Sequence, residues 1–370
     1  YSNYGSYSMM SPRTAYGVRN ELSSPYIYNN TIKLTVLDYP FSKGGSVVFN
    51  ADYMIGVENI RSPNVIIDRC KITVESTGYC GITLTGVNAT LKSTGIRVTN
   101  SSVDISFSGT KSSYMALAPW ANAQLAFLSD IYFNNVSMKA TGDPTQPVNG
   151  MLVTYGASTL FLNSSMSGQG FGVFVTDYSK AFIDQSKVTG ALRVGIQAET
   201  LSEVTVVNSA VLNCARGVLS VQSRVLVRDC TFSNGHEFML DKASTVNVYN
   251  TPHTKNAASM MDSASWINVS WPITLKVTWQ NGLPAERASV FIQTISGEKV
   301  FQGVTDETGA PAGTIWVKEY FGHLQTITQY TPHRIGVSKG RSSSLDLFVI
   351  DKALTIDFML VDTVPPDLQV

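Results

Sequence analysis

The residues of this 370-residue sequence that suit acid–base chemistry are a few separate carboxylates and one histidine. Acid–base hydrolysis needs two or three carboxylates that converge on one face, with one of them held protonated. Elimination assisted by calcium needs a carboxylate site for the cation and an Arg or Lys base. The candidates in this chain are Asp177, Asp184, Asp229, Asp241, Asp262 and His236.

The spacing of these side chains does not predict that they converge. Asp184 and Asp229 lie nearly two units of an internal repeat apart, in adjacent rather than equal positions of the unit. Asp177 and Asp241 have no carboxylate at the matching position of a neighbouring unit. We expect His236 to be a solvated turn residue. We therefore assign no catalytic residue; the sequence leaves enzymatic activity open and favours its absence.

The four histidines and four cysteines do not form a metal-binding pattern. We predict no metal site and no cofactor; structural calcium is compatible with the sequence but nothing indicates it. Cys70 and Cys230 occupy a repeat position that serine fills elsewhere, which favours small buried thiols. The alternative is two disulfides, Cys70–Cys80 and Cys214–Cys230, which an extracellular location would permit.

Six Asn-x-Ser/Thr triplets are candidate acceptors for N-linked glycans. A chain rich in Ser and Thr also produces such triplets by chance, so both interpretations stay open. Asn163 is the least suitable, because we expect its position to turn inward. The six are Asn29, Asn88, Asn100, Asn135, Asn163 and Asn268.

An internal repeat of about 22 residues must position all of these side chains. Four units begin with glycine, and each continues about a dozen residues later with a polar residue followed by Ser, Thr or Cys. A fixed period of this size is typical of a solenoid, whose units bury their apolar faces by stacking. The glycines are Gly150, Gly172, Gly195 and Gly217, and the polar positions form a predicted turn ladder of Asn163, Gln185, Asn208, Asp229 and Asn250.

The apolar residues of each unit have the period of a strand. Phe161 and Thr159 precede the polar position by two and four residues, as Val206 and Val204 do two units later. Residues two apart share one face of a strand. Several short strands per unit, each paired with its equivalent in the next, predict an all-β fold, a right-handed parallel β-helix with about 22 residues per coil. We expect Asn, Asp and Ser to pair backbone groups at one corner and glycine to prevent crowding at another.

The amino-acid composition indicates which kinds of partner this chain can bind. The formal net charge is zero and 15% of residues are charged, against about 25% in typical domains, so a nucleic-acid partner is not expected. No apolar run approaches the ~20 residues that span a bilayer, so we predict no membrane span in this segment. The length predicts two or three domains. Because the sequence starts with Tyr1 and shows no signal peptide, we expect a mature or trimmed product.

Both ends of the chain differ from the repeat. Residues 1–30 are rich in Tyr, Ser and Asn and predict either a cap on the first coil or an assembly arm that adds a strand to another copy. We place the β-helix at 31–268 and an antiparallel β-sandwich at 269–361, from short strands separated by turn residues. Residues 362–370 predict a linker into a further domain. Three aromatic residues, expected to cap the last coil at the domain junction or else to stack on a sugar, are Trp266, Trp271 and Trp279.

Two resemblances follow from these residues. The coils resemble the pectin-lyase-like and NosD-like right-handed β-helix proteins, which include polysaccharide lyases, hydrolases and epimerases. Residues 272–361 resemble the carboxypeptidase-regulatory-like, immunoglobulin-type domain through Gly282-Leu283-Pro284, Ala288-x-Val290 and the turn Thr305-Asp306-x-x-Gly309. Such domains are typically spacers in prokaryotic, especially archaeal, cell-surface proteins, and this one transfers no catalytic residue.

These observations lead to two hypotheses. The first is a non-catalytic extracellular structural protein of a cell envelope, in a surface layer, sheath, fibre or adhesin, whose partners are copies of itself. The second is a polysaccharide-active enzyme or a glycan-binding β-helix that contacts cell-wall or host glycans. Carboxylates that converge along a groove would favour the enzyme, and a flat polar face with subunit contacts would favour the scaffold.

Overall fold

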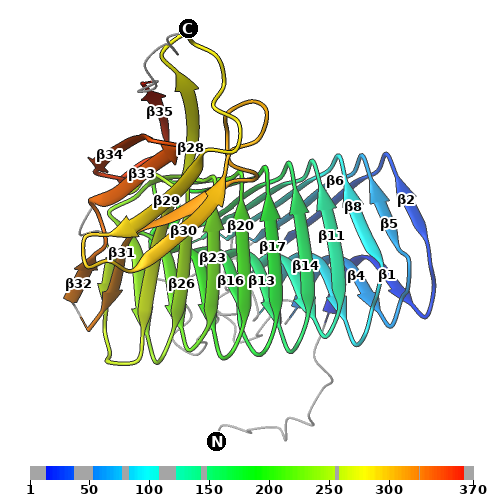
Figure 1. Ribbon diagram of the computed structural model, residues 1–370. Helices are drawn as coiled ribbons and strands as arrows, with labels where there is room; N and C mark the ends of the chain where they lie inside the picture. The colour runs from blue at the N-terminus through cyan, green and yellow to red at the C-terminus, as the bar shows by residue number, and fades with distance from the viewer. Residues whose placement is uncertain are drawn as a thin grey trace, which may run out of the picture. The chain divides into compact units, whose positions relative to one another are not determined.

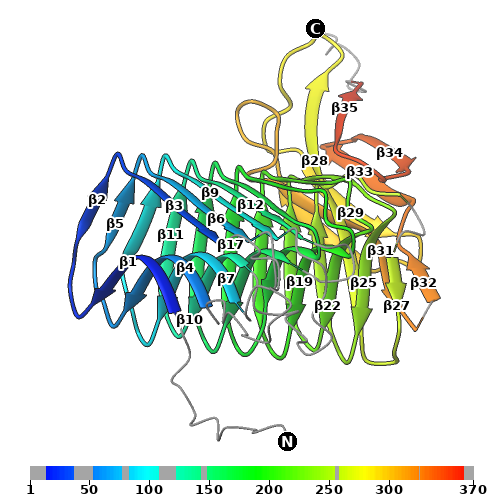
Figure 2. The same cartoon turned by 180° about the vertical axis from the view of Figure 1, so that it is seen from behind.

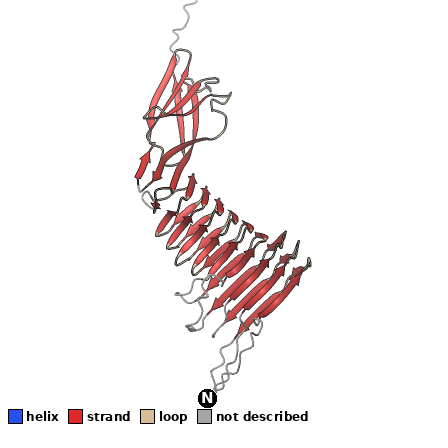
Figure 3. Cartoon of the chain, turned by 90° about the horizontal axis from the view of Figure 1, so that it is seen from below, coloured by secondary structure: helices blue, strands red, loops and turns tan. Residues whose placement is uncertain are grey.

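The computed structural model describes residues 14–36, 53–76, 83–107, 122–142, 148–254, 258–324 and 326–361. These residues form strands, turns and bends without a helix (Figure 3). They divide into two compact units. The first unit contains the residues up to Leu226, Cys230–Thr245 and His253–Ser259. The second unit contains Val227–Asp229, Val246–Pro252 and the chain from Met260 onward. The first unit is a right-handed parallel β-helix, so the predicted fold class is confirmed.

Three parallel sheets build the coils. The chain enters each coil in sheet A, bends into sheet B and then into sheet C (Figures 1 and 2). The sheet A strands, in spatial order, are β1 (Thr14–Glu21), β4 (Tyr53–Ile60), β7 (Thr83–Thr90), β10 (Asn122–Phe127), β13 (Asn149–Thr154), β16 (Phe171–Val175), β19 (Val194–Glu199), β22 (Arg216–Val221), β25 (His236–Asp241) and β27 (Ala258–Met260).

Sheets B and C are ordered in the same way. The coil strands of sheet B are β2 (Tyr26–Tyr28), β5 (Ile66–Asp68), β8 (Ile96–Thr99), β11 (Asp130–Asn134), β14 (Ser158–Leu162), β17 (Lys180–Asp184), β20 (Glu203–Val207), β23 (Arg224–Arg228) and β26 (Thr245–Tyr249). The strands of sheet C are β3 (Thr31–Val36), β6 (Lys71–Ser76), β9 (Ser102–Phe107), β12 (Ser137–Thr141), β15 (Ser165–Gly168), β18 (Lys187–Thr189), β21 (Ala210–Leu212) and β24 (Thr231–Ser233).

The core consists of columns of apolar side chains that run from coil to coil. Phe133, Phe161 and Ile183 are in register on β11, β14 and β17 and are fully buried. The rings of Phe133 and Phe161 stack with centroids 5.0 Å apart and planes 7° apart. Like side chains at equal positions keep the coils aligned, because a slip by one residue would turn every apolar side chain outward. The strand period in the sequence placed Phe161 in this column correctly.

The glycines that open the repeat lie within strands of sheet A and not at a corner, which corrects the expected position. A Cβ on Gly172 would lie 2.3 Å from Cγ1 of Val188 in sheet C and 2.6 Å from the carbonyl oxygen of Gly195 in the next coil. At Gly195 it would lie 2.7 Å from Val211 Cγ1 and 2.9 Å from the Gly217 oxygen. Glycine is thus required by the close approach of sheet C and of the next coil, not by an unusual φ.

The first coil begins before residue 31. Strand β1 pairs in parallel with β4, and β2 pairs with β5, so residues 14–30 belong to the coils and only residues 1–13 of the expected cap or arm lie outside the described part. Residues 362–370, the expected linker, also lie outside it. The expected boundary at residue 268 falls inside one continuous strand, β28 (Trp266–Trp279).

The second unit contains an antiparallel sheet with the order β30 (Lys299–Val304), β29 (Ser289–Thr294), β33 (His333–Lys339) and β34 (Ser342–Phe348). Strand β28 pairs antiparallel with β31 (Ile315–His323) and parallel with β35 (Leu354–Leu360), and β31 pairs with β32 (Thr326–Gln329). Gly282, Gly297 and Gly309 have φ of 83°, 89° and 81°, so the predicted turns are present.

Candidate functional site

The polar ladder of the repeat has an inner and an outer half. The serine after each polar residue points inward: Ser164 N–H donates to Ser186 Oγ at 3.0 Å, and Ser186 N–H donates to Ser209 Oγ at 3.0 Å. Ser186 Oγ in turn donates to the Asp184 carbonyl at 2.7 Å. Each buried hydroxyl therefore pairs two backbone groups that the bend would leave without partners.

The outer half points toward solvent, which corrects the expected inward turn at Asn163. Asn163, Gln185 and Asn208 are exposed and have φ of 48°, 47° and 47°. In the second unit Asp229 and Asn250 share this conformation, with φ of 55° and 45°. Asn and Asp tolerate the left-handed region better than most residues, and this tolerance explains the residue type at this position.

A second serine ladder, which the sequence analysis missed, follows the bend between sheets A and B. Ser62 N–H donates to Ser93 Oγ and Ser93 N–H donates to Ser129 Oγ, both at 3.1 Å. Ser202 N–H donates to Ser223 Oγ at 3.3 Å. The recurrence of serine every 21 residues from Ser202 to Ser244 was the available signal.

The glycan acceptor candidates divide by exposure. Asn29, Asn100, Asn135 and Asn163 are exposed at the outer corner between sheets B and C. Asn88 is 6% exposed and its Nδ2 donates to Glu58 Oε1 at 3.4 Å, so this amide is not available to an enzyme in the folded chain. The half-buried Asn268 donates to Asn247 Oδ1 at 3.2 Å.

The described cysteines are buried thiols that do not form disulfides, which corrects the alternative of a Cys214–Cys230 disulfide. Cys214 Sγ donates to the Leu212 carbonyl at 3.4 Å, and Cys230 Sγ donates to the Val206 carbonyl at 3.5 Å. Burial raises the pKa of the Cys214 thiol, so it is a poor nucleophile. Cys80, the proposed partner of Cys70, lies outside the described residues.

Each candidate aspartate has a local structural partner. Asp177 accepts from Thr154 Oγ1 at 2.7 Å, and Asp184 accepts from Asn208 Nδ2 at 3.0 Å. Asp229 accepts from Asn250 Nδ2 at 2.6 Å. Asp241 Oδ1 accepts from Lys242 N–H at 2.9 Å, and Asp262 Oδ1 accepts from Ala264 N–H at 2.6 Å.

Histidines and acidic residues do not gather into a possible metal site in the part of the chain that the structure describes. His236 is exposed at the first residue of β25, so it is solvated as expected but lies in a strand.

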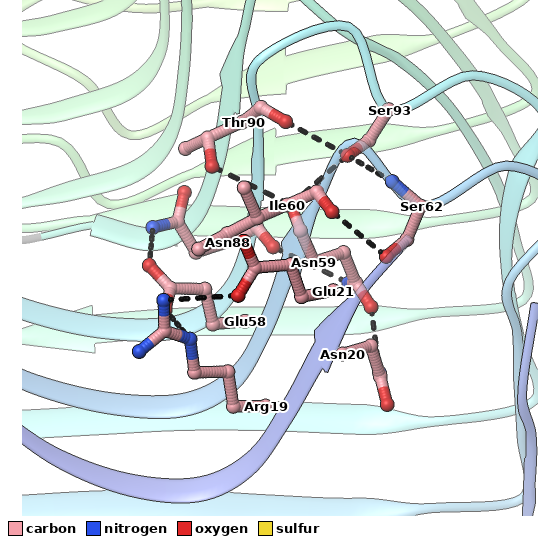
Figure 4. Close-up of polar contacts among 10 residues, drawn as sticks. All are labelled: Arg19, Asn20, Glu21, Glu58, Asn59, Ile60, Ser62, Asn88, Thr90 and Ser93. Atoms are coloured by element: carbon pink, nitrogen blue, oxygen red, sulfur yellow. Dashed lines mark hydrogen bonds and ion pairs between the residues drawn. The ribbon is translucent and has the colours of Figure 1, made fainter. Parts of the chain in front are cut away.

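A polar cluster lies on the first three strands of sheet A (Figure 4). Glu58 is 7% exposed and lies 3.6 Å from Arg19 Nε, and Arg19 Nη2 lies 3.4 Å from Glu21 Oε2. Asn20 Nδ2 donates to Asn59 Oδ1 at 2.8 Å. The Arg19–Glu58 ion pair and the Asn20–Asn59 amide hydrogen bond thus tie β1 to β4. The repeat does not predict this cluster, because Asn20 and Asn59 on β1 and β4 are 39 residues apart and the period is about 22.

One carboxyl of the first unit is shifted in the direction that suits a general acid. Burial raises the pKa of Glu237 on β25, and its Oε2 accepts from Thr254 N–H at 2.8 Å. Glu237 occupies the position of the repeat glycines, being next in register after Gly217. Glu21 and Glu58 lie on β1 and β4, whereas Glu237 lies on β25 near the other end of sheet A, so these carboxylates are not close enough to act together.

The three tryptophans lie along β28 and do not form one cluster. Trp266 and Trp279 are the two ends of this strand, about 40 Å apart at ~3.3 Å per residue. Trp271 is 3% exposed, and its Nε1–H donates to Glu319 Oε2 at 2.6 Å. Lys339 lies over the Trp279 ring at 5.5 Å. Their separation excludes a shared stacking platform for one sugar.

The outer face of sheet B contains a shallow hollow of about 490 Å³. Gly95 and Ser158 contribute little side chain to it, and Tyr132, Leu160 and the flanking charges of Arg97 and Asp130 surround it. A ring face, an aliphatic surface, a cation and an anion are thus available together on one sheet face.

Comparisons with known proteins agree with the fold. The family model described as the right handed beta helix region matches residues 94–257. The comparison with curated proteins finds no match. In the described residues no helix has the length and apolar character needed to cross a membrane.

Several solved structures are similar at low identity. The ORF18 protein of Geobacillus virus E2 is 11% identical over 83% of this chain and 70% of that chain, with a TM-score of 0.36. The enzymatically active domain of tailspike protein 2 from bacteriophage CBA120 is 9% identical over 90% of this chain and 70% of that chain, with a TM-score of 0.30. The A-module of a mannuronan C-5 epimerase from Azotobacter vinelandii is 10% identical over 65% and 90%, with a TM-score of 0.23. Nothing about the activity of this chain follows from these values.

Proposed function

We propose that this chain is a non-catalytic structural protein of the cell surface, in which a β-helix followed by a spacer domain of immunoglobulin type assembles with copies of itself. The observation that carries this proposal is that polar side chains on the outer faces pair with one another between neighbouring coils. Lys180 Nζ lies 2.8 Å from Glu203 Oε2, and Lys33 Nζ lies 3.1 Å from Glu75 Oε2, each across neighbouring coils. Asn135 Nδ2 donates to Asn100 Oδ1 at 3.0 Å.

These contacts hold neighbouring coils together. The charged and amide side chains that form them are therefore occupied by structural partners. A glycosidase-type site needs two carboxyl groups about 5 to 10 Å apart with different proton affinities. Glu237, whose pKa is raised, lies on a different coil from Glu21 and Glu58, the carboxylates beside Arg19. An extracellular location and glycans on the exposed acceptors Asn29, Asn100, Asn135 and Asn163 belong to the same proposal.

A second candidate function is glycan binding or polysaccharide modification, and the hollow beside Tyr132 favours it. Aromatic rings and flanking polar groups are the usual elements of a ligand site.

Incubation of the purified chain with a panel of polysaccharides separates the two functions. The structural role predicts no new reducing ends and no unsaturated products, together with assemblies in electron microscopy and light scattering. Depolymerisation of any polysaccharide, abolished by Glu237→Gln, would overturn it.

A further inference from the structure

The outer face of sheet B carries an exposed column of mainly apolar side chains. Parallel pairing places Tyr26, Ile66, Arg97, Tyr132, Leu160, Phe182 and Thr205 at equal positions of successive strands. Tyr26, Leu160 and Phe182 are 61%, 38% and 41% exposed. Its uninterrupted apolar part, Tyr132, Leu160 and Phe182, is the kind of exposed apolar surface that marks an interaction site.

Charged residues occupy the neighbouring column of the same face. Asp130, Ser158, Lys180 and Glu203 are in register on β11, β14, β17 and β20. Gly95 has the same position on the previous coil, because Ile96 pairs with Ile131.

Lys180 and Glu203 form an ion pair at 2.8 Å. Asp130 and Arg97, by contrast, have neither an ion pair nor a side-chain hydrogen bond within the described residues, although both line the hollow. One anion and one cation therefore remain to be paired from outside.

We propose that this face binds the same face of a second copy of the chain, and this inference rests on the proposed assembly function. The two copies are related by a two-fold axis that runs parallel to the strands and passes through Leu160. The coil order of the second copy is then reversed. Leu160 faces Leu160 of the second copy, and Tyr132 faces its Phe182, so apolar surface covers apolar surface.

The same axis brings a charge of opposite sign to each of the unpaired residues. Asp130 lies one coil before the axis and Lys180 one coil after it, so each faces the other across the interface. Glu203 lies two coils after the axis, and its long side chain faces the position of Gly95, beside Arg97. The hollow therefore receives the Glu203 side chain of the second copy, and four charges of each copy join alternating networks.

The parallel arrangement of two copies fits less well. A two-fold axis along the stacking direction would place Arg97 against Arg97 of the second copy. It would also leave Asp130 opposite the amide of Asn134, the last residue of the same strand. Opposition of like charges is unfavourable in an interface, so the pattern selects the reversed order.

The area of the proposed interface indicates how tightly the two copies should bind. Seven strands, β5 to β23, at about 4.8 Å spacing and about five residues of ~3.3 Å each give a patch of roughly 34 by 17 Å. The two copies together would bury on the order of 1,200 Å², which is the lower end of specific interfaces. We therefore expect reversible dimerisation that depends on concentration.

Sedimentation velocity of the full chain between low and high micromolar concentration tests the surface. We expect a monomer–dimer equilibrium that Asp130→Lys weakens at least tenfold, because this lysine faces Lys180 of the second copy. The double variant Asp130→Lys/Lys180→Asp restores opposite charges and should return the dissociation constant to within about threefold of wild type. Asp104→Lys on β9 of sheet C is the matched control and should leave association unchanged. Thermal midpoints verify that each variant is folded.

The outcomes separate this surface from the function on which it rests. A wild-type chain that stays monomeric, or a double variant that does not recover, overturns the proposed interface. Association that Asp130→Lys and Asp104→Lys leave equally intact shows self-assembly through another face, so the function would stand and the surface would fall. If Asp130→Lys abolishes binding to an oligosaccharide panel but not association, the face is a glycan site and the interface is wrong.

Discussion

The smallest unit that holds the coils in register is a serine hydroxyl at a bend. Ser186 is 5% exposed; its Oγ accepts from Ser164 N–H at 3.0 Å and donates to the Asp184 carbonyl at 2.7 Å. Cysteine fills the same position in other coils, where Cys70 Sγ donates to the Asp68 carbonyl at 3.3 Å. A small side chain with a donor and an acceptor is therefore what this position requires.

Substitution at Ser186 tests this requirement. Ser186→Ala leaves the Ser164 N–H buried without an acceptor and should reduce the free energy of unfolding by about 1–3 kcal/mol. Ser186→Cys keeps a weaker donor and acceptor and should cost less. Chemical denaturation measures both, and amide hydrogen exchange should accelerate at Ser164 in the alanine variant. Equal stability of the alanine variant and wild type would show that the ladder is not stabilising.

At the scale of the element, the distance between sheets A and C is set by the glycine column. Sheet C side chains such as Val188 and Val211 reach the backbone of sheet A at Gly172 and Gly195. The column ends at Glu237 on β25, where a glutamate side chain takes the place of the glycine hydrogen and its carboxylate accepts from Thr254 N–H.

A single methyl group should disturb this contact. Gly172→Ala would place a Cβ 2.3 Å from Val188 Cγ1 and 2.6 Å from the Gly195 carbonyl oxygen. Because the carbonyl belongs to the backbone of the next coil, both coils must shift, and we expect a loss of about 1–3 kcal/mol. Lys187→Ala, an exposed substitution on β18, is the control and should change stability by less than about 0.5 kcal/mol. Thermal unfolding followed by circular dichroism compares them, and equal midpoints would contradict the packing role of the glycine.

The sequence predicts the position of a residue well where a single physical cause determines its residue type. Phe161 and Val206 were placed correctly in the core because a strand has a period of two and only one face is buried. Asn163 and Ser164 are neighbours of similar polarity, and the left-handed φ at Asn163 decides which of them points outward. Glycine at Gly172 is compatible with a turn or with close packing, and only the position of Val188 distinguishes the two. The hollow at Gly95 and Asp130 joins residues 35 apart, so a 22-residue period cannot align them.

At the scale of the whole molecule, one buried histidine predicts how the second compact unit responds to acid. The second unit contains His333 on β33, which is fully buried and whose ring nitrogens both lack a hydrogen-bond partner among the described residues. Burial lowers the pKa of His333 from its ordinary value of 6.5 to about 4. The folded chain keeps this ring neutral, while the unfolded chain binds a proton near pH 6.5.

The second unit should therefore lose stability as the pH falls from about 6.5 to about 4, the interval in which the unfolded state binds more protons. A shift of this size corresponds to at most about 3 kcal/mol. Four of the five tryptophans belong to this unit, so tryptophan fluorescence during thermal unfolding at pH 7.5, 6, 5 and 4.5 reports mainly on it. His333→Phe should flatten this pH dependence, because phenylalanine fills a similar volume without a titratable nitrogen. His236→Gln, at an exposed position of the first unit, should leave the dependence as in wild type. A wild-type midpoint that does not change with pH, or a decline that is equally steep in His333→Phe, would show that His333 does not control the acid response.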